Sequence, residues 1–344
     1  MPSKHSHRKD EHVSLAEKFY NPSEDFFKSL RFVDFGLPKI GINDVDISTK
    51  IGGLQLNIPF YIEAISGGSE TTKKINYRLA KIAAKTGLAM AVGSQSVGIN
   101  EPQTADSFKI VRKTNPAGII FANIGADKNP SQAQKAINMI EADALEIHVN
   151  PAQELIMPEG SRNFDFLNNI KAIKQNVSVP VIVKQVGFGM NSETMDQLRQ
   201  SGISIVNISG VGGTNFAKIE NFRRPNKDMN YLKNWGLTTP ESLLESQKFL
   251  KSFEIIASGG ITNPLDMAKC LSLGASACGM AGKFLHLIYH NSDEEIIDLV
   301  NNWIYGLKAI MVMLNCLNLK SLKKHKLLLS QNLKNFVNQR NIEY

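Results

Sequence analysis

Eight short apolar segments recur along the chain, and a turn rich in glycine, serine or asparagine follows almost every one of them. Near-continuous apolar runs are typical of parallel strands that are buried on both faces, and helical patterns stand between these runs. Eight strand–helix units predict an α/β fold, a (β/α)8 TIM barrel. The segments cover residues 59–65, 88–92, 118–123, 144–149, 180–184, 203–208, 254–257 and 275–280.

The residues outside this pattern suggest three parts. We expect residues 1–58 to form an N-terminal extension that carries a substrate clamp, residues 59–319 the barrel, and residues 320–344 a C-terminal helical tail packed on the barrel. The connection after the sixth strand, residues 215–237, is long and polar. It therefore predicts an extended active-site loop.

Charge and composition narrow the classes of partner. The 344-residue chain has a net charge of +7, which fits nucleic acid, a membrane surface or an anionic small molecule. The densest basic run, residues 320–326, has no interleaved aromatic residues, so it predicts a solvated face. There is no apolar signal segment, no apolar run of the ~18–20 residues that span a membrane, and an odd number of cysteines without metal-ligand spacing. We expect a cytoplasmic protein that binds an anionic small molecule, and neither nucleic acid nor membrane.

Polar side chains gather where the fourth predicted strand ends. His148, Asn150, Gln153 and Glu154 fall within seven positions. In a barrel all strand carboxyl ends lie at one mouth, where chemistry sits. A single carboxylate fits Mg²⁺, which completes its shell with water and substrate phosphate, but it fits zinc poorly. Taken singly, each of these residues fits a solvated loop or a hydrogen-bonded core histidine as well.

Glycine turns follow the last two predicted strands. Ser258-Gly-Gly and Ala281-Gly stand where barrels commonly bind a phosphate through backbone N–H groups and a helix N-terminus. Glycine permits close backbone approach. The earlier glycine turns lack the third glycine of a dinucleotide fingerprint, so a Rossmann domain is not predicted.

Two basic features, Lys184 and the run at residues 8–12, have two interpretations each. Lys184 ends an otherwise apolar strand, so it could form a Schiff base or stabilise negative charge on a bound ring such as a reduced flavin. Ser66, Ser94 and Asn123 would then bind the polar edge of the ring. The run Arg8-Lys9-Asp10-Glu11-His12 is either a solvated terminus or a clamp over an anionic substrate.

The sequence resembles the type 2, flavin-dependent isopentenyl-diphosphate isomerases over most of its length. That resemblance implies a barrel that binds FMN, is active with reduced flavin and Mg²⁺, and interconverts isopentenyl and dimethylallyl diphosphate in isoprenoid biosynthesis. We expect NADPH as the reductant of the flavin and, by analogy, a homo-oligomer such as a tetramer or octamer. The resemblance is carried by RKDEH (8–12), PFYIEAISGGSE (59–70), GLAMAVGSQ (87–95), IHVN…QELIMPEGSR (147–162), PVIVKQVGFGM (180–190), SGVGGTNFAKIEN (209–221) and ASGGITNPLDMAKCLSLGA…GMAG (257–282).

Position by position, the resemblance implies catalytic roles for Gln153, Lys184 and His148, and Mg²⁺ on Glu154. It implies substrate contacts at Arg8, Lys9, His12, His148, Asn150 and Gln153. The FMN contacts that it implies are Ala64, Ile65, Ser66, Ser94, Asn123, Lys184, Ser209, Thr214, Gly259, Gly260, Ala281 and Gly282. Some family members carry an arginine where this chain has Ser96, and Arg223 is the candidate to replace that contact with the diphosphate.

The implied reaction protonates one end of an alkene and deprotonates a carbon two positions away, without net redox. We expect the reduced FMN ring to carry the proton and to stabilise the cationic centre, Lys184 to tune the ring, and Gln153 to orient the substrate or hold the proton in transit. The alternative is an FMN-dependent oxidoreductase on the same barrel, such as a 2-hydroxy-acid oxidase. Such a site needs a histidine base and arginines that grip a carboxylate, and no such pairing follows the later strands. A phosphate-binding barrel without catalysis is a third interpretation, which the polar ring at the strand ends disfavours.

Overall fold

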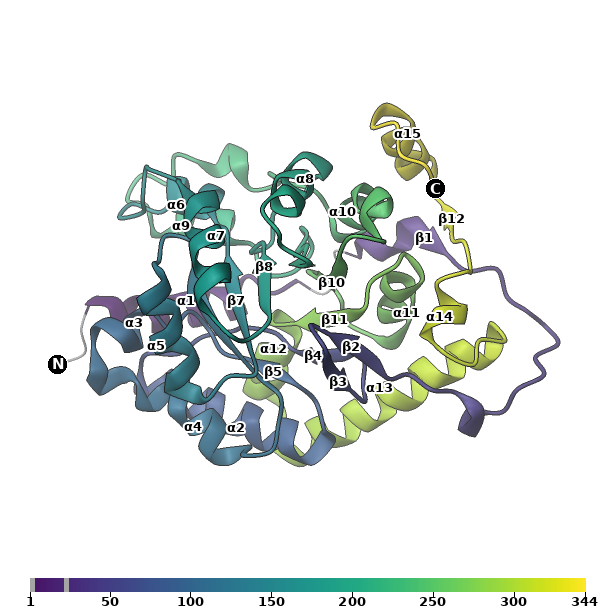
Figure 1. Ribbon diagram of the computed structural model, residues 1–344, viewed down its shortest axis with the longest axis horizontal. Helices are drawn as coiled ribbons and strands as arrows, with labels where there is room; N and C mark the ends of the chain where they lie inside the picture. Colours follow the sequence, from purple (N-terminus) through teal and green to yellow (C-terminus); the bar gives the residue numbers. More distant parts are fainter. Residues whose placement is uncertain (1–3, 22–24) are drawn as a thin grey trace.

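Eight parallel strands close into a barrel, which confirms the predicted fold (Figure 1). The computed structural model describes residues 4–21 and 25–344, with side chains from residue 6 onward. Around the barrel the strands follow the order β10-β11-β4-β5-β6-β7-β8-β9. Their bounds are β4 (Phe60–Ile62), β5 (Met90–Ala91), β6 (Ile120–Gly125), β7 (Ala144–His148), β8 (Val181–Lys184), β9 (Ile205–Asn207), β10 (Glu254–Ser258) and β11 (Ala277–Met280).

Helices connect the strands and form the outer layer. Local sequence sets several of their ends: Ser69 caps α2 with a reciprocal Thr72 bond, and Gly87 ends α2 in a left-handed conformation at φ 75°. The helices are α2 (Glu70–Thr86), α3 (Ser96–Asn100), α4 (Asp106–Thr114), α5 (Pro130–Ile140), α6 (Pro151–Ile156), α7 (Phe166–Asn176), α8 (Ser192–Gln200), α9 (Phe216–Arg223), α10 (Thr239–Glu245), α11 (Pro264–Ser272), α12 (Gly282–His290) and α13 (Asp293–Met313), with short 3-10 turns η1 (Phe26–Ser29), η2 (Ile42–Asp44), η3 (Pro102–Thr104), η4 (Asn230–Leu232) and η5 (Gln247–Phe249).

Alternation along the strands divides the barrel interior into an apolar and a polar layer. In β7, for example, Ala144 packs in the inner apolar cluster while Leu145 and Ile147 belong to the outer core. Successive strand residues point to opposite faces, so Glu146 and His148 share the inner face with Ala144. The hairpin β2 (Thr49–Ile51) and β3 (Leu54–Leu56) adds Ile51 to the inner cluster. The polar layer therefore lies toward the carboxyl ends of the strands.

The two ends of the chain contact each other and the barrel. The N-terminal helix α1 (Lys4–Lys18) packs against α2, α9 and α12. Further along, β1 (Leu30–Arg31) pairs antiparallel with β12 (Leu328–Leu329). Along the chain, β12 follows α14 (Leu319–Leu322) and precedes α15 (Gln331–Gln339). The division into extension, barrel and tail at residues 58 and 319 stays a prediction.

The connection after the sixth barrel strand differs from the expected loop. Residues 216–223 form α9, capped by the Asn215 side chain on the Lys218 N–H, and residues 230–232 form η4. The expectation of a loop followed from polarity, but the buried positions Ala217, Ile219 and Glu220 give this segment a face that packs.

One described helix, α13, is long and apolar enough to cross a membrane by length and composition alone, with a mean hydropathy of 1.3. The sequence of α13 is interrupted by Asp298, Asn301, Asn302 and Lys308, so it is not an uninterrupted apolar run. Its buried residues Ile296, Val300, Trp303 and Leu307 recur every three to four positions, and the Trp303 ring contacts Phe60 and Phe284. This face packs on the barrel in the manner of a core helix.

Candidate active site

A cavity of ≈ 580 Å³ opens at the carboxyl ends of the barrel strands. It brings together residues that are far apart in the sequence, since Arg8 and Gly282, 274 positions apart, both line it. Lys184 from β8 and Glu154 from α6 line the same cavity, as they must if they belong to a single site. With the exception of Arg223, the site residues that the sequence singled out line the cavity: Arg8, Lys9, His12, Ala64, Ile65, Ser66, Ser94, Asn123, His148, Asn150, Gln153, Glu154, Lys184, Ser209, Thr214, Gly259, Gly260, Ala281 and Gly282.

The floor of the cavity is a buried cluster of charges. Lys184 Nζ lies 2.9 Å from Glu63 Oε1 and 3.7 Å from Glu146 Oε2. The Tyr61 hydroxyl donates to Glu63 Oε2 at 2.8 Å, and Asn207 Nδ2 donates to the same oxygen at 2.5 Å. The Lys184 ammonium is therefore paired with carboxylates.

Burial and the neighbouring Glu63 carboxylate raise the pKa of Glu146 well above its ordinary value. Burial also opposes ionisation of Glu63, but the Lys184 ammonium lowers the pKa of that carboxyl below its ordinary value. Conversely, burial disfavours the Lys184 charge, while Glu63 and Glu146 raise the pKa of Lys184. The cluster thus holds one ion pair and one protonated carboxyl, and it is neutral overall.

His148 is a neutral imidazole. Its Nδ1 lies 2.8 Å from Asn123 Oδ1, so Nδ1–H donates and Nε2 keeps its lone pair. Burial, together with the Lys184 and Lys9 charges, lowers the pKa of His148 to about 3. A neutral His148 would contact a substrate as a hydrogen-bonding group and not as a cation.

A buried carboxylate that sequence reasoning missed holds the predicted catalytic amide. Gln153 Nε2 donates to Glu220 Oε1 at 2.9 Å, and His12 Nε2 lies 3.0 Å from the same oxygen. Arg223 Nη1 donates to Glu220 Oε2 at 2.7 Å. Burial opposes ionisation, but these hydrogen bonds hold the pKa of Glu220 below its ordinary value. Glu220 thereby fixes both Gln153 and His12.

Arg223 does not serve as the substitute cation proposed for Ser96. Its guanidinium is shared among Glu11 at 2.8 Å, Glu159 at 2.6 Å and Glu220 at 2.7 Å. Arg223 is absent from the described cavity lining, whereas Ser96 is part of it and lies 3.3 Å from Ser94 between hydroxyl oxygens. The role of Arg223 is to join α9 to α1.

Two cations, Arg8 and Lys9, line the α1 side of the cavity, and Arg8 Nη1 lies 3.6 Å from Glu159 Oε1. Burial and the neighbouring Arg8 guanidinium lower the pKa of Lys9 to about 8, and Lys9 Nζ reaches only the Ser94 carbonyl, at 3.5 Å. Arg8 Nε is buried without a hydrogen-bond partner in the described part of the chain. Such under-satisfied cations favour an anionic ligand.

Glu154 lies beside these cations. Its Oε1 accepts from Asn150 Nδ2 at 3.0 Å, and its Oε2 accepts from the Ser161 N–H at 2.7 Å. Asp127 and Glu159 also line the cavity, but they are engaged with Lys128 and with Arg223. On this side of the cavity, Glu154 is thus the lining carboxylate without a basic partner among the described residues. Such a carboxylate suits a hard cation, which prefers oxygen ligands.

The opposite side of the cavity is built from glycine turns. A Cβ on Gly259 would meet the Gly210 carbonyl at 2.0 Å, and one on Gly213 would meet the Gly260 nitrogen at 3.1 Å. Gly259 also has φ +100°, so these positions need glycine. The N-terminus of α12 adds Lys283. Burial lowers the pKa of Lys283, and no carboxylate among the described residues offsets this effect. Backbone N–H groups, a helix N-terminus and a cation are the groups with which proteins commonly bind phosphate.

Known proteins resemble the chain in both sequence and fold. The FMN-dependent dehydrogenase family model matches residues 101–329. Isopentenyl-diphosphate delta-isomerase of Latilactobacillus sakei is 49% identical over 338 residues, which are 98% of this chain and 97% of that protein. The enzyme of the same name from Staphylococcus haemolyticus is 46% identical over 337 residues, or 98% of this chain and 97% of its own.

Solved structures share the fold at much lower identity. A mandelate oxidase variant with 2-hydroxy-phenylacetamide superimposes with a TM-score of 0.63 at 15% identity, over 93% of this chain and 90% of its own. A flavocytochrome b2 variant with benzoylformate gives 0.65 at 18% identity, over 92% and 79% of the two chains. At such identity the likeness concerns the barrel alone.

Proposed function

The chain belongs to the FMN-dependent, type 2 isopentenyl-diphosphate delta-isomerases, and we propose that its one cavity holds the flavin and a Mg²⁺-bound diphosphate together. The enzyme interconverts isopentenyl and dimethylallyl diphosphate and uses FMN. The observation that carries the proposal is the division of one cavity into a glycine-lined side and a cationic side. Two phosphorylated ligands need two such sides.

FMN fits the glycine-lined side. Its phosphate would lie on the turns at Gly212–Gly213 and Gly259–Gly260 and at the start of α12, beside Lys283. The close glycine contacts leave no room for side chains there. Ring contacts are proposed for the residues named from the sequence: Ala64, Ile65, Ser66, Ser94, Asn123, Lys184, Ser209 and Thr214, with Ala281 and Gly282 toward the phosphate.

The diphosphate fits the opposite side. Arg8, Lys9 and His12 would bind the diphosphate oxygens. Asn150 would hold the hydrocarbon part of the substrate in place. The unpartnered Arg8 Nε and the depressed pKa of Lys9 support an anion here. Glu154 would bind Mg²⁺, which usually takes one or two protein carboxylates plus substrate phosphate and water.

Reduced FMN, when bound, supplies an electron-rich ring that stabilises positive charge and a ring nitrogen that exchanges a proton. The protein positions the alkene. Gln153 Nε2 donates to Glu220, and Gln153 Oε1 accepts from Asn150 Nδ2 at 3.4 Å, so the second lone pair of Oε1 would be the acceptor toward the substrate. His148 offers a neutral Nε2 lone pair, and the Lys184–Glu63 pair fixes the charge beneath the ring site.

The Mg²⁺ role is tested on Glu154→Gln. We expect the variant to bind FMN as the wild type does, and to lose at least about tenfold in kcat/KM at fixed Mg²⁺, roughly 1.4 kcal/mol. Asp196→Asn, on the surface of α8 and paired with Arg199, is the control and should keep full activity. Unchanged activity of Glu154→Gln without added Mg²⁺ would exclude Glu154 as a ligand.

The alternative activity, oxidation of a 2-hydroxy acid, draws on the fold shared with mandelate oxidase and flavocytochrome b2. Among the described lining residues Arg8 is the single arginine, and it comes from α1 instead of a late strand. A carboxylate-gripping pair is therefore missing from the described lining. Oxygen uptake on addition of lactate or mandelate separates the two activities, since the isomerase consumes no oxygen.

NADPH as reductant, a cytoplasmic location and a homo-oligomer complete the proposal. Exposed apolar side chains support self-association: Leu37 is 81% exposed, and its segment runs along the end of α13, where the Phe35 N–H donates to the Met313 carbonyl at 3.2 Å. Light scattering should give a mass above one chain, and Leu37→Asp should lower it. Tyr231→Asp, at an equally exposed site on η4, is the control.

A further inference from the structure

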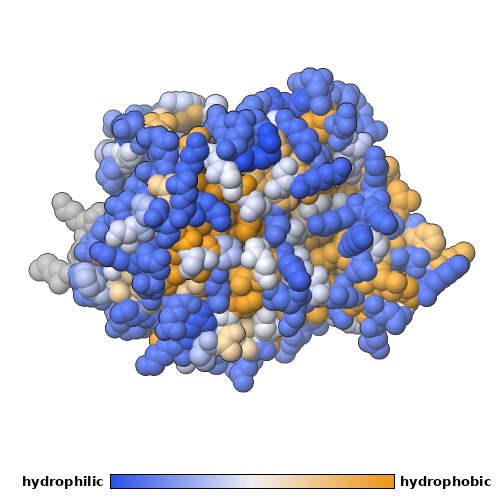
Figure 2. Space-filling model, in the orientation of Figure 1, coloured by the Kyte–Doolittle hydropathy of each residue, from blue (hydrophilic) through white to orange (hydrophobic). Residues whose placement is uncertain are grey.

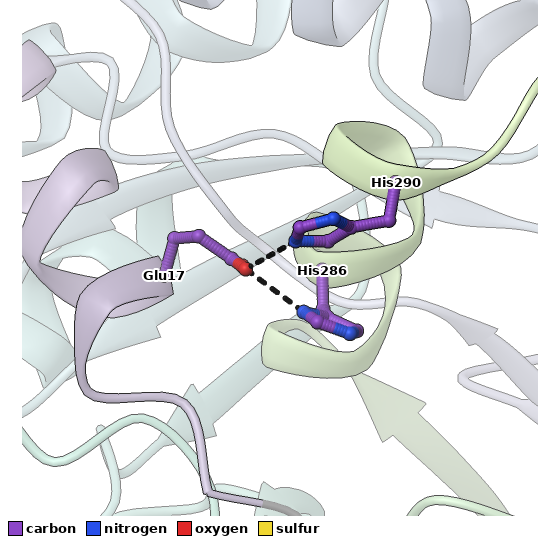
Figure 3. A group of neighbouring side chains, drawn as sticks. All are labelled: Glu17, His286 and His290. Carbon is purple, nitrogen blue, oxygen red and sulfur yellow. Dashed lines mark hydrogen bonds and ion pairs between the residues drawn. The ribbon is translucent and has the colours of Figure 1, made fainter.

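Glu17, His286 and His290 meet beside the cavity, on two different helices (Figure 3). Glu17 Oε1 lies 2.8 Å from His286 Nδ1 and 2.8 Å from His290 Nε2. Glu17 comes from α1, and both histidines come from α12. None of the three lines the cavity or belongs to the isomerase machinery described above.

The local sequence and packing prearrange this group. His286 and His290 are four residues apart in α12, so their rings share one helix face. The ring of Tyr20 stacks on His286, with centroids 4.5 Å apart and planes 20° apart. The two histidine rings themselves lie 4.4 Å apart between centroids. Stacking limits the rotation of His286, so the nitrogens converge on one point.

The donor set matches a transition-metal site. Two imidazole nitrogens and one carboxylate oxygen are ligands that Zn²⁺ accepts, with a fourth position left for water. At Zn–N and Zn–O lengths near 2.1 Å, ligand atoms stand about 3.0–3.4 Å apart. The two carboxylate–nitrogen separations, 2.8 Å each, are a few tenths of an ångström shorter than that, and all three ligand atoms lie within 4.8 Å of one another.

Two further observations leave room for an ion. Glu17 Oε2 is buried and has no hydrogen-bond partner among the described residues, so it can turn toward a metal without breaking a bond. The His290 side chain is 55% exposed, which gives an ion and its water access from solvent.

We propose that Glu17, His286 and His290 bind one Zn²⁺ ion, which fixes α1 to α12. This site differs from Mg²⁺ on Glu154, because imidazole nitrogens favour zinc over the hard cations that oxygen ligands select. The ion takes the place of the two hydrogen bonds between the imidazoles and the carboxylate, and each neutral imidazole then carries its proton on its other ring nitrogen.

A fixed α1 has a consequence for the proposed function, on which this step rests. The same helix carries Arg8, Lys9 and His12 into the cavity. Zn²⁺ should therefore order the diphosphate side before the substrate arrives, and lower KM without changing kcat.

Calorimetric titration of ZnCl₂ into tag-free, FMN-loaded protein in excess Mg²⁺ tests the site. We expect one saturable Zn²⁺ per chain in the wild type, and affinity at least about tenfold weaker in Glu17→Gln and in His290→Asn, as when one of three protein ligands is lost. His7→Gln removes an exposed histidine from the same helix and should bind Zn²⁺ as the wild type does. An unchanged FMN content shows that each variant is folded.

Two results would overturn the proposal: equal Zn²⁺ affinity in the wild type and Glu17→Gln, or loss of binding in Glu154→Gln, which would place the ion in the cavity. Amide exchange provides a second readout. Zn²⁺ should slow exchange in α1 of the wild type but not of His290→Asn. Neither measurement requires turnover. The zinc proposal can therefore be refuted while the isomerase function holds, and the isomerase function can be refuted while the zinc proposal holds.

Discussion

Glu220 anchors three side chains with two oxygens. Gln153 and His12 meet one oxygen, and Arg223 meets the other. Because the carboxylate is fully buried, no water can replace a lost partner. The position of Gln153 at the substrate therefore depends on a residue 67 positions away in the sequence.

Glu220→Gln should lower kcat about 10–100-fold, because removing the charge weakens charge-assisted hydrogen bonds worth about 1.5–3 kcal/mol. FMN affinity should stay within twofold. Glu245→Gln is the matched control, since Glu245 is also buried and paired with an arginine, Arg340, but lies outside the cavity. Steady-state kinetics of both variants decide the point, and equal kcat values for Glu220→Gln and the wild type would refute the positioning role.

Lys9 predicts a pH dependence of substrate capture. Burial and Arg8 lower its pKa to about 8, so the ammonium is charged below that pH and neutral above it. The value of kcat/KM, which reports the free enzyme, should fall as the pH rises through about 8. Lys9→Arg should move this fall to higher pH, because arginine stays charged. An unmoved basic limb in the variant would count against Lys9.

Residues that follow a strand were predictable, and residues defined by contacts across elements were not. His148, Gln153 and Lys184 stand at strand ends, so the barrel alone sends them to one mouth. Glu220 lay in a segment interpreted as a polar loop. Glu146 was within reach of sequence reasoning, because alternation with Ala144 and His148 places it inside the barrel.

At the scale of elements, strands β4, β7 and β8 supply the buried charges beneath the cavity. Glu63, Glu146 and Lys184 form one ion pair with a spare proton on Glu146. Because its pKa is raised, Glu146 keeps its proton to a higher pH in the folded protein than in the unfolded chain, where glutamate titrates near its ordinary pKa, about 4.3. The stability of the protein should fall with rising pH by up to about 1.4 kcal/mol per unit from this group.

Glu146→Gln removes that dependence while keeping the shape of the side chain. We expect its midpoint of thermal unfolding to exceed that of the wild type more at pH 8 than at pH 6. Glu63→Gln should do the opposite and destabilise at both pH values, since it leaves the buried Lys184 without its partner. Parallel melting curves for the wild type and Glu146→Gln over this range would mean that the carboxyl is ionised.

Helix α1 is held over the cavity by Arg223, which reaches Glu11 on α1 and Glu159 after α6. Arg223→Gln should loosen α1, speed amide exchange in residues 6–18, and raise KM about tenfold. Arg199→Gln is the control, because Arg199 pairs with Asp196 on the surface of its own helix. A raised KM without faster exchange in α1 would point to a direct substrate contact instead.

At the scale of the molecule, the repeat of eight apolar segments was sufficient to predict the barrel. Parallel strands buried on both faces give a strong signal in sequence. The packing of α1 and the pairing of β1 with β12 leave no such signal in the sequence, because these are contacts between distant segments of ordinary composition. The cavity is complete only when α1 closes on a barrel that begins near residue 60. Figure 2 shows a mostly hydrophilic surface around this assembly, with hydrophobic residues exposed at one edge.

The central claim, that reduced FMN and the diphosphate act in one cavity without net redox, is tested most directly by anaerobic turnover in D₂O. The dithionite-reduced enzyme should convert isopentenyl diphosphate, incorporate solvent deuterium into dimethylallyl diphosphate, and leave the flavin reduced after many turnovers. The oxidised enzyme should be inactive. Equal rates for the two flavin states, or one flavin oxidised per product formed, would contradict the account.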